Sequence, residues 1–461
     1  MNPPLLVRLE PHPDARNAAV GTGTIRIGSI IASIPALSTA LLPSEKGKRC
    51  DECHRVQTDS AQLSRCSGCA SFWYCGTACQ GKAWKAHHRK LCKRYNTFTA
   101  SNQYQALTSH DQVDALLLSQ LLVDPDVWCG ERAQDDLHHP HATMLDLLGV
   151  PRSDGFVPPL CLPASAQTPE TLALAADLYA RFGNNNFVLH SHLDAYAHGV
   201  FPLASRLFNH SCAPSAVCKY IITPSGAPRM DVVALRDVAE CEEVTIPYLD
   251  PALPYRTRQD ALRANYGFTC GCRLCTFQSS IDPVPAPPLR TDTDSPTDDA
   301  ALREFALGDV ARGSVRIPTA PGMFEGLPLE LRAVLHEDYL PALSEAFSRT
   351  AHEGPYGHAV EAGLTLLALY VVVYPPNYPQ IGMHALELAK TLWNLLCAEP
   401  GALAGLGAGS EEQVRRHAGD ALAFATGVLS NFGAEGDEGG PLDEVQVLGK
   451  VLEDDAQGRA H

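Results

Sequence analysis

The sequence lacks any apolar run long enough to cross a bilayer. Its longest apolar stretch, residues 364–374, is about half the ~20 residues that a membrane-spanning helix needs. The start of the chain, Met1-Asn2-Pro3-Pro4, also lacks the charged and continuous apolar segments of a secretory signal. We therefore expect no membrane contact and no export, and we expect a monomer in the nucleus, the cytoplasm or both.

Basic residues are scarce overall but concentrated in one segment. The chain has 36 Lys and Arg against 52 Asp and Glu, a net charge of −16. Residues 44–95 nevertheless hold 11 basic and 4 acidic residues, a net charge of +7. A basic module on an acidic body can contact nucleic acid or an acidic protein, although an ordinary solvated surface has the same composition. A weak DNA contact ranks last among these interpretations, because no helix with base-reading spacing follows.

Cysteine is abundant, with 16 residues, and most of it is clustered. In a chain without an export signal, clustered cysteines are typical of metal sites rather than disulfides. Two clusters, together with Cys212, account for 11 cysteines. We expect the other five to be buried as small apolar side chains: Cys129, Cys161, Cys218, Cys241 and Cys397.

The first cluster places eight soft ligands within residues 50–92, enough for two tetrahedral Zn2+ sites. Interleaved pairs predict one site of Cys50, Cys53, Cys75 and Cys79, and a second site of Cys66, Cys69, His88 and Cys92. His88 is preferred over His87 because it gives the usual three-residue spacing to Cys92. Two ions would replace the apolar core that so short a unit cannot build.

A second cluster, Cys270, Cys272 and Cys275, has the pattern C-x-C-x2-C and is one ligand short of a closed site. Cys212, in the run Asn209-His210-Ser211-Cys212, is the candidate for the fourth ligand. We therefore predict three structural Zn2+ ions, since none of the three sets leaves an open position.

Elements alternate along the chain. Strands are expected in residues 4–9, 25–34, 232–235 and 243–246, and helices in residues 112–123 and 169–182. Residues 277–300 are rich in Pro, Asp, Ser and Thr and predict a linker. Beyond residue 301 the pattern is helical, with helices expected at 359–374, 383–398 and 411–429. The predicted fold class is α+β followed by an all-α tail.

These motifs, in this order, resemble the SET and MYND domain lysine methyltransferase family. Residues 50–92, with the pairs Tyr74-Cys75 and Cys79-Gln80, are similar to the MYND finger; residues 184–276 are similar to the SET core and its zinc segment. The resemblance implies seven parts: the N-terminal half of SET (1–49), the MYND finger (50–92), a helical SET insert (93–183), core SET (184–249), a post-SET zinc segment (250–276), a linker (277–300) and a TPR-like helical domain (301–461).

The resemblance also implies a role for individual residues. Asn209 and His210 would hold S-adenosylmethionine, as would Asn185 in the run Asn184-Asn185-Asn186-Phe187, and Phe268 would stack on the adenine. Tyr248 would be the catalytic tyrosine and Tyr266 would line the lysine channel. The glycine turn of the family would be Gly21 and Gly23, although here it lies only five residues before Gly28.

The implied activity is methyl transfer from S-adenosylmethionine to a lysine amine of a protein substrate, histone or non-histone. Such a displacement depends mostly on alignment of the two reactants. The first alternative is a catalytically weak scaffold that recruits Pro-rich partners through the finger. Gln80 and Trp84, four residues apart on one helix face, suit an extended Pro-containing peptide, although Trp84 packing against the zinc knuckle is an equally simple interpretation. The second alternative is a DNA-binding regulator that uses the basic finger.

Overall fold

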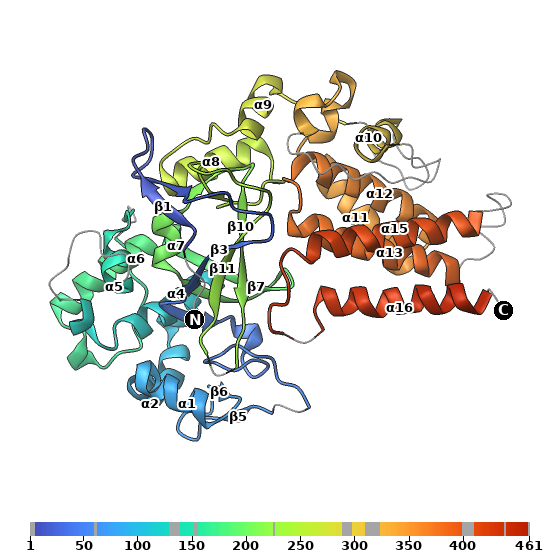
Figure 1. Ribbon diagram of the computed structural model, residues 1–461. Helices are drawn as coiled ribbons and strands as arrows, with labels where there is room; N and C mark the ends of the chain where they lie inside the picture. The colour runs from blue at the N-terminus through green and yellow to red at the C-terminus, as the bar shows by residue number, and fades with distance from the viewer. Residues whose placement is uncertain are drawn as a thin grey trace.

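The computed structural model describes residues 5–59, 62–128, 139–150, 155–224, 226–287, 297–308, 323–398, 410–437 and 439–459. Strands occupy the middle of the molecule, and a bundle of C-terminal helices lies beside them (Figure 1). The Cys-rich segment with α1 and α2 projects from another side of the strands. The expected α+β class, with strands first and helices last, is confirmed.

Within the described residues the strands form five small sheets. β10-β11-β3 and β4-β8-β7 are antiparallel three-stranded sheets, β1-β2 and β5-β6 are antiparallel pairs, and β9 and β12 are parallel. The strands are β1 Val7–Glu10, β2 Ala18–Gly21, β3 Ile30–Pro35, β4 Ser38–Leu41, β5 Ser64–Arg65, β6 Trp73–Tyr74, β7 Asn186–Ser191, β8 Asp194–Val200, β9 Asn209–His210, β10 Ala216–Ile221, β11 Arg229–Ala234 and β12 Thr245–Ile246.

Strands from before and after the Cys-rich segment share the same sheets. β3 pairs with β11, and β4 pairs with β8, although about 190 and about 150 residues, respectively, separate the partners along the chain. One apolar core beneath these strands includes Ile31, Phe201 and Val232, each of them buried. The Cys-rich segment and its following helices are therefore an insertion into one β fold.

The insertion is helical after its first Cys-rich turns. Helix α1 continues through a π-helical turn, Trp84–His88, into α2. Helix α4 then packs on β4 and β8, which attaches the insertion to the sheet. The helices up to the second β segment are α1 Thr77–Ala83, α2 Arg89–Thr99, α3 Asn102–Gln105, α4 Ser109–Leu121, α5 Pro140–Asp146 and α6 Pro169–Asn185.

The remaining helices follow from residue 202 onward. They are α7 Pro202–Leu207, α8 Tyr255–Tyr266, α9 Arg273–Ile281, α10 Thr297–Leu307, α11 Tyr339–Glu353, α12 Tyr356–Val373, α13 Pro379–Ala398, α15 Ser410–Leu429 and α16 Pro441–Arg459. Helices α9 and α10 both enter the segment 277–300 that was expected to be a linker. Residues 282–287 are the described part of that segment without helix, and residues 288–296 lie outside the described residues.

Helix α12 is the centre of the C-terminal bundle. Among the described residues it is the helix whose length and composition would suffice to cross a membrane, with a mean hydropathy of 1.5 over 18 residues. It packs against α10, α11 and α13, and half of it is buried. This environment is that of a core helix, which explains its apolar sequence without a bilayer.

A segment between α15 and α16, residues 431–440, attaches the bundle to the β fold. The backbone N–H of Ile222 donates to the carbonyl of Glu435 over 2.8 Å, and the N–H of His192 donates to its carboxylate over 2.7 Å. Asp437 accepts from Ser191 and from the guanidinium of Arg49. We call residues 431–440 the docking segment.

Candidate active site and metal centres

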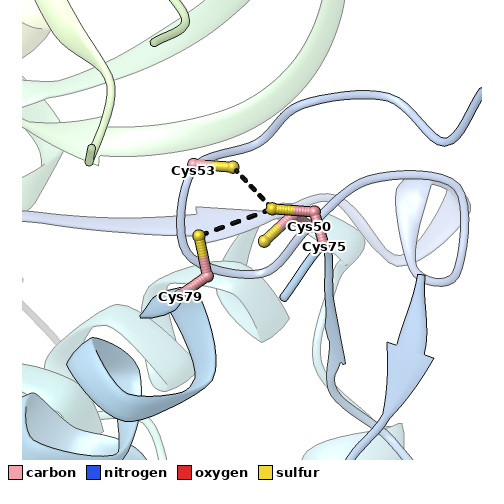
Figure 2. Close-up of side chains that lie close together, drawn as sticks. All are labelled: Cys50, Cys53, Cys75 and Cys79. Carbon is pink, nitrogen blue, oxygen red and sulfur yellow. Dashed lines mark hydrogen bonds between the residues drawn. The ribbon is translucent and has the colours of Figure 1, made fainter. Parts of the chain in front are cut away.

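The first Cys group forms where the start of the finger meets α1. The sulfur atoms of Cys50, Cys53, Cys75 and Cys79 point toward one another (Figure 2). Adjacent sulfurs lie 3.6 Å apart between Cys53 and Cys75, and 3.5 Å apart between Cys75 and Cys79. A zinc–sulfur distance of about 2.3 Å requires sulfur–sulfur separations of about 3.8 Å, so the group fits tetrahedral Zn2+.

The second group combines three cysteines with one histidine of the π-helical turn. Cys66 and Cys92 sulfurs are 3.7 Å apart, and the Nε2 atom of His88 lies 3.3 Å from Cys66 and 3.6 Å from Cys69. All four side chains are buried. The structure places His88 in this group and His87 outside it. The Nδ1 atom of His87 is buried and has no hydrogen-bond partner among the described residues.

The third group brings together residues far apart in the sequence. Cys212 follows β9, whereas Cys270, Cys272 and Cys275 flank the start of α9, and the four form one group suited to a metal ion. Sulfurs of Cys212 and Cys275 are 3.5 Å apart. With the two groups of the finger, the described part of the chain holds three Cys-containing groups suited to zinc.

Arg258, which the sequence analysis did not single out, lies against the third group. Its side chain is fully buried in α8, and its Nε atom donates toward the Cys212 sulfur over 3.2 Å. It also donates to the carbonyl of Pro251 and to Gln278. Four thiolates around one Zn2+ carry a net charge of −2, so a buried guanidinium offsets part of that charge.

One large cavity, of about 1750 Å³, opens between the β fold and the C-terminal bundle. Six of the predicted cofactor and catalytic residues line it: Asn185, Asn209, His210, Tyr248, Tyr266 and Phe268. The bundle side contributes Tyr378, Met383 and part of the docking segment. The sequence therefore predicted residues that lie far apart along the chain, in or next to α6, β9, β12 and α8, and the fold brings them together in one cavity.

Gly21 and Gly23 do not line this cavity. Gly21 lies in β2, and a Cβ atom there would be 3.1 Å from the carbonyl oxygen of Ala239, so the glycine permits close packing of the chain on that loop. The residues of the N-terminal segment that do line the cavity are His12 and residues 14–17. None of these residues is a glycine, so a search for the glycine turn of the family could not identify them.

The aromatic residues form one contiguous group in the cavity. The ring centroids of Tyr248 and Tyr266 are 4.9 Å apart, and that of His210 is 5.2 Å from Tyr248 and 6.1 Å from Phe268. Burial raises the pKa of Tyr248, and the nearby Tyr266 raises it further; burial also raises the pKa of Tyr266. Both phenols are therefore protonated at neutral pH and serve as hydrogen-bonding groups, not as tyrosinate bases.

The hydroxyl of Tyr248 has a fixed orientation. It donates its proton to the backbone carbonyl of Phe208 over 2.7 Å. Its remaining lone pairs are then free to accept an N–H, because a hydroxyl has one donor and two acceptor sites. Parallel pairing of β12 with β9 brings Tyr248 beside the Asn209-His210 run.

Asn209 is held by two partners that the sequence analysis did not name. Its amide nitrogen donates to the carboxylate of Glu243 and to the carbonyl of Asn17, each over 2.7 Å. Both N–H groups of the Asn209 amide are therefore used, so that within the described residues its oxygen is the atom available to a ligand. Asn185 is buried at the end of α6, where its amide nitrogen donates to the carbonyl of Arg181 over 2.7 Å.

Gln80 and Trp84 lie on the finger, away from the cavity. Trp84 is 41% exposed, although its ring also makes an edge contact with His88 at 5.8 Å. Gln80 is half-buried one turn earlier. Both interpretations of Trp84 have a structural counterpart, a packing contact with a zinc ligand and an indole face open to solvent.

Comparison with known proteins gives two kinds of match. The family model of the MYND finger matches residues 45–92. The N-lysine methyltransferase SMYD2 of Gallus gallus is 28% identical over 264 residues, 55% of this chain and 56% of the relative. The histone-lysine N-methyltransferase ASHR1 of Arabidopsis thaliana is 27% identical over 239 residues, 50% of this chain and 46% of the relative.

The matched part thus spans about half the length of these curated relatives. A solved SET domain of LSMT, bound to lysine and AdoHcy, aligns with 98% of this chain and 88% of its own, at 12% identity and a TM-score of 0.27, too low to bear on the fold. Both sequence comparisons confirm the resemblance to the SET and MYND domain lysine methyltransferases, and the chain carries that family's MYND finger.

Proposed function

We propose that this protein transfers a methyl group from S-adenosylmethionine to the side-chain amine of a lysine in a protein substrate. The observation that carries the proposal is the position of Tyr248, at the end of β12 and within one cavity with Asn209, His210 and Phe268. The names of the curated relatives, N-lysine and histone-lysine methyltransferases, support the same reaction class.

The cavity suits two reactants. Its volume of about 1750 Å³ exceeds the ~300–1,000 Å³ of a typical single-ligand pocket, which leaves room for a cofactor and an inserted side chain. The amide groups of Asn185 and Asn209 and the ring of Phe268 are a hydrogen-bonding and stacking set, with Asn209 offering its oxygen as an acceptor, that fits an amino-acid end and an adenine. S-adenosylmethionine, when bound, supplies an electrophilic methyl group on a positively charged sulfur.

The tyrosines act on the lysine. A free lysine amine has a pKa of about 10.4, and transfer from water into an aromatic, buried channel disfavours its ammonium form. Because the Tyr248 proton is committed to the Phe208 carbonyl, the Tyr248 oxygen accepts an N–H of the amine and orients the nitrogen lone pair toward the methyl group. The Tyr266 ring, at 4.9 Å, restricts the channel on one side.

A methyl-transfer assay tests the proposal. Purified protein with S-adenosylmethionine carrying a labelled methyl group should label proteins of a whole-cell lysate at lysine, whereas Tyr248→Phe should not. Calorimetry should show that wild type binds S-adenosylmethionine and that Asn209→Ala binds it less tightly by about 1–3 kcal/mol. A wild type that neither binds the cofactor nor labels any protein would favour the scaffold function.

A second function, recruitment of Pro-rich protein segments by the finger, is favoured by the exposed indole of Trp84. Trp84→Ala should weaken binding to Pro-rich peptides while the metal content stays unchanged. Loss of metal and structure in this variant would instead make Trp84 a packing residue. Binding of the finger to DNA predicts a steep loss of affinity with salt and with removal of Lys82, Lys85, Arg89 and Lys90, so salt-insensitive binding would dismiss that function.

A further inference from the structure

Outside the three Cys groups, a fourth cluster of metal-binding side chains joins the helical insertion to the sheet. His110 and Asp114 lie one turn apart on the same face of α4, and His198 lies on the adjacent strand β8. One ligand atom from each of the three residues lies within 4.8 Å of the others. Spacing of four residues on a helix plus one ligand from a strand is a common way to build a metal site.

The centre of the cluster is a buried carboxylate. Asp114 is 3% exposed, and its ion-pair partners among the described residues are the two imidazoles. The Nε2 atom of His110 is 3.6 Å from Oδ2, and the Nδ1 atom of His198 is 3.8 Å from Oδ1. A buried carboxylate without a cation is costly, so this position calls for positive charge between the rings.

The contacts of Asn186 indicate that this positive charge is a metal ion and not a proton on Nδ1 of His198. Its amide nitrogen donates to Oδ1 of Asp114 and lies 3.4 Å from Nδ1 of His198. An amide N–H directed at Nδ1 requires a lone pair there, and that lone pair also faces the carboxylate. A metal ion between Nδ1 and the carboxylate would take up this lone pair in place of the Asn186 N–H, which keeps its hydrogen bond to Asp114 and orients the carboxylate as outer-shell partners do in metal sites.

We propose that His110, Asp114 and His198 form a fourth metal site, for Zn2+ or a similar divalent transition ion. Two imidazoles and one carboxylate are the ligand set of such borderline ions, and separations of 3.6 and 3.8 Å need to shorten by only a few tenths of an ångström around an ion at about 2.0–2.1 Å. The His110 side chain is 58% exposed, so solvent reaches the remaining positions.

The site has a structural consequence. It ties α4 to β8 directly beside Asn186, the residue that follows Asn185 and also lines the cavity. A bound ion would thus fasten the helical insertion to the sheet at the edge of the proposed cofactor site. It differs from the three Cys groups in having no thiolate, so a weak chelator should remove its ion first.

Zinc titration of the intact protein tests the proposal. After mild chelation that leaves the Cys groups loaded, calorimetry with ZnCl2 should show uptake of one further equivalent by wild type, and added Zn2+ should raise its thermal midpoint. His110→Ala removes an exposed ligand without disturbing the core, and Asp114→Asn keeps the shape of the central side chain. Either variant should bind that equivalent at least about tenfold more weakly and lose the thermal shift.

The matched control is His336→Ala, because Nδ1 of His336 also lies 3.6 Å from a carboxylate, that of Asp338, with no second histidine assigned to it among the described residues. This variant should bind like wild type. The proposal is overturned if wild type takes up no further equivalent, or if His110→Ala takes it up with unchanged affinity. Co2+ should report the site by weak absorption without the intense thiolate bands of a Cys group.

Discussion

The Nδ1 atom of His210 accepts a hydrogen bond from the backbone N–H of Tyr248 over 2.9 Å. A backbone N–H can only donate, so the proton of the neutral ring resides on Nε2, which lies 3.2 Å from the sulfur of Cys212. The same imidazole therefore links the tyrosine proposed to orient the substrate to the third Cys group. We therefore expect the geometry of the third Cys group and the geometry at Tyr248 to depend on each other through this one side chain.

Substitution of His210 should separate the two links. In His210→Asn, the amide oxygen can replace Nδ1 as the acceptor for Tyr248, whereas the contact with Cys212 is lost. We expect this variant to keep more methyl transfer than His210→Ala, which should fall by at least about tenfold. Both variants should release metal from the third group more readily. Equal activity of His210→Ala and wild type would contradict the coupling.

Tyr248→Phe removes one oxygen and keeps the ring. Transfer should fall by about 10²–10⁴-fold, the range for a positioned hydrogen-bonding or acid–base group, while S-adenosylmethionine binding survives. The lost bond to Phe208 should cost only about 1 kcal/mol of stability. Tyr196→Phe is the matched control, because Tyr196 is buried, its hydroxyl has no hydrogen-bond partner among the described residues and it does not line the cavity. An active Tyr248→Phe enzyme would refute the assignment.

The metal ligands could be predicted from the sequence because tetrahedral coordination restricts spacing. C-x2-C pairs and the x3 step from His88 to Cys92 reflect the reach of short side chains to one ion, and the structure groups the residues in that way. Cys212 was identifiable only because three thiolates leave a fourth position open. The order of strands and helices was also predictable, since their periodicities differ.

Features that depend on the path of the chain in space could not be predicted. The N-terminal wall of the cavity is formed by residues 14–17, without the glycines that a known pattern requires. Arg258 has the sequence context of an ordinary helical surface residue, yet α8 turns it into the interior. His198 joins His110 and Asp114 only through the packing of α4 on β8.

Arg258 offers a direct test of charge compensation at the third Cys group. Arg258→Met keeps much of the buried volume but removes the donor to Cys212, so the net charge of the zinc–thiolate unit loses its nearest cation. We expect the third Zn2+ to be lost at about 10–100-fold lower chelator concentration than in wild type. The other two ions should be unaffected, because the finger lies elsewhere. Arg256→Met, at an exposed position two residues away, should behave as wild type.

His384 predicts a pH-dependent stability of the C-terminal bundle. Burial lowers the pKa of His384 to about 4 and so favours the neutral ring in the fold, although the hydrogen bond from its Nε2 to the carbonyl of Gly363, at 2.7 Å, acts in the opposite direction. An unfolded histidine has a pKa of about 6.5. The folded pKa is lower than the unfolded pKa. The contribution of neutral His384 to the free energy of unfolding is therefore complete above about pH 6.5 and is lost as the pH falls toward 4.

At pH 5 the free energy of unfolding should be lower by about 2 kcal/mol because of His384. Urea unfolding of wild type and His384→Gln at pH 7 and pH 5 measures it. The two proteins share every other titrating group, so the wild type should lose about 2 kcal/mol more than the variant between these pH values. Parallel losses in both proteins would show that His384 does not carry this dependence.

Asp437 should determine how firmly the docking segment holds the bundle against the β fold. Its carboxylate accepts from the Arg49 guanidinium over 2.7 Å and from Ser191 over 2.6 Å, and the Asp437 and Arg49 side chains are only 4% and 10% exposed. Asp437→Ala leaves the buried guanidinium with Glu45 as its remaining carboxylate, at 3.2 Å. Because Glu45 still partly compensates the guanidinium, we expect a loss of stability of about 1–3 kcal/mol, below the full cost of leaving a buried charge unpaired.

Asp437→Asn retains the shape and an oxygen acceptor, so it should lose less than Asp437→Ala. Limited proteolysis would report the loss locally, as faster cleavage within residues 431–440, because an undocked segment exposes its backbone. Glu444→Ala is the control, since its contact with Lys390 lies at a part-exposed position within the bundle and should affect docking little.

Since the docking segment forms part of the cavity wall, Asp437→Ala should also weaken binding of the protein substrate more than binding of S-adenosylmethionine. Equal protease sensitivity of Asp437→Ala and wild type would show that the Arg49 contact does not hold this wall in place.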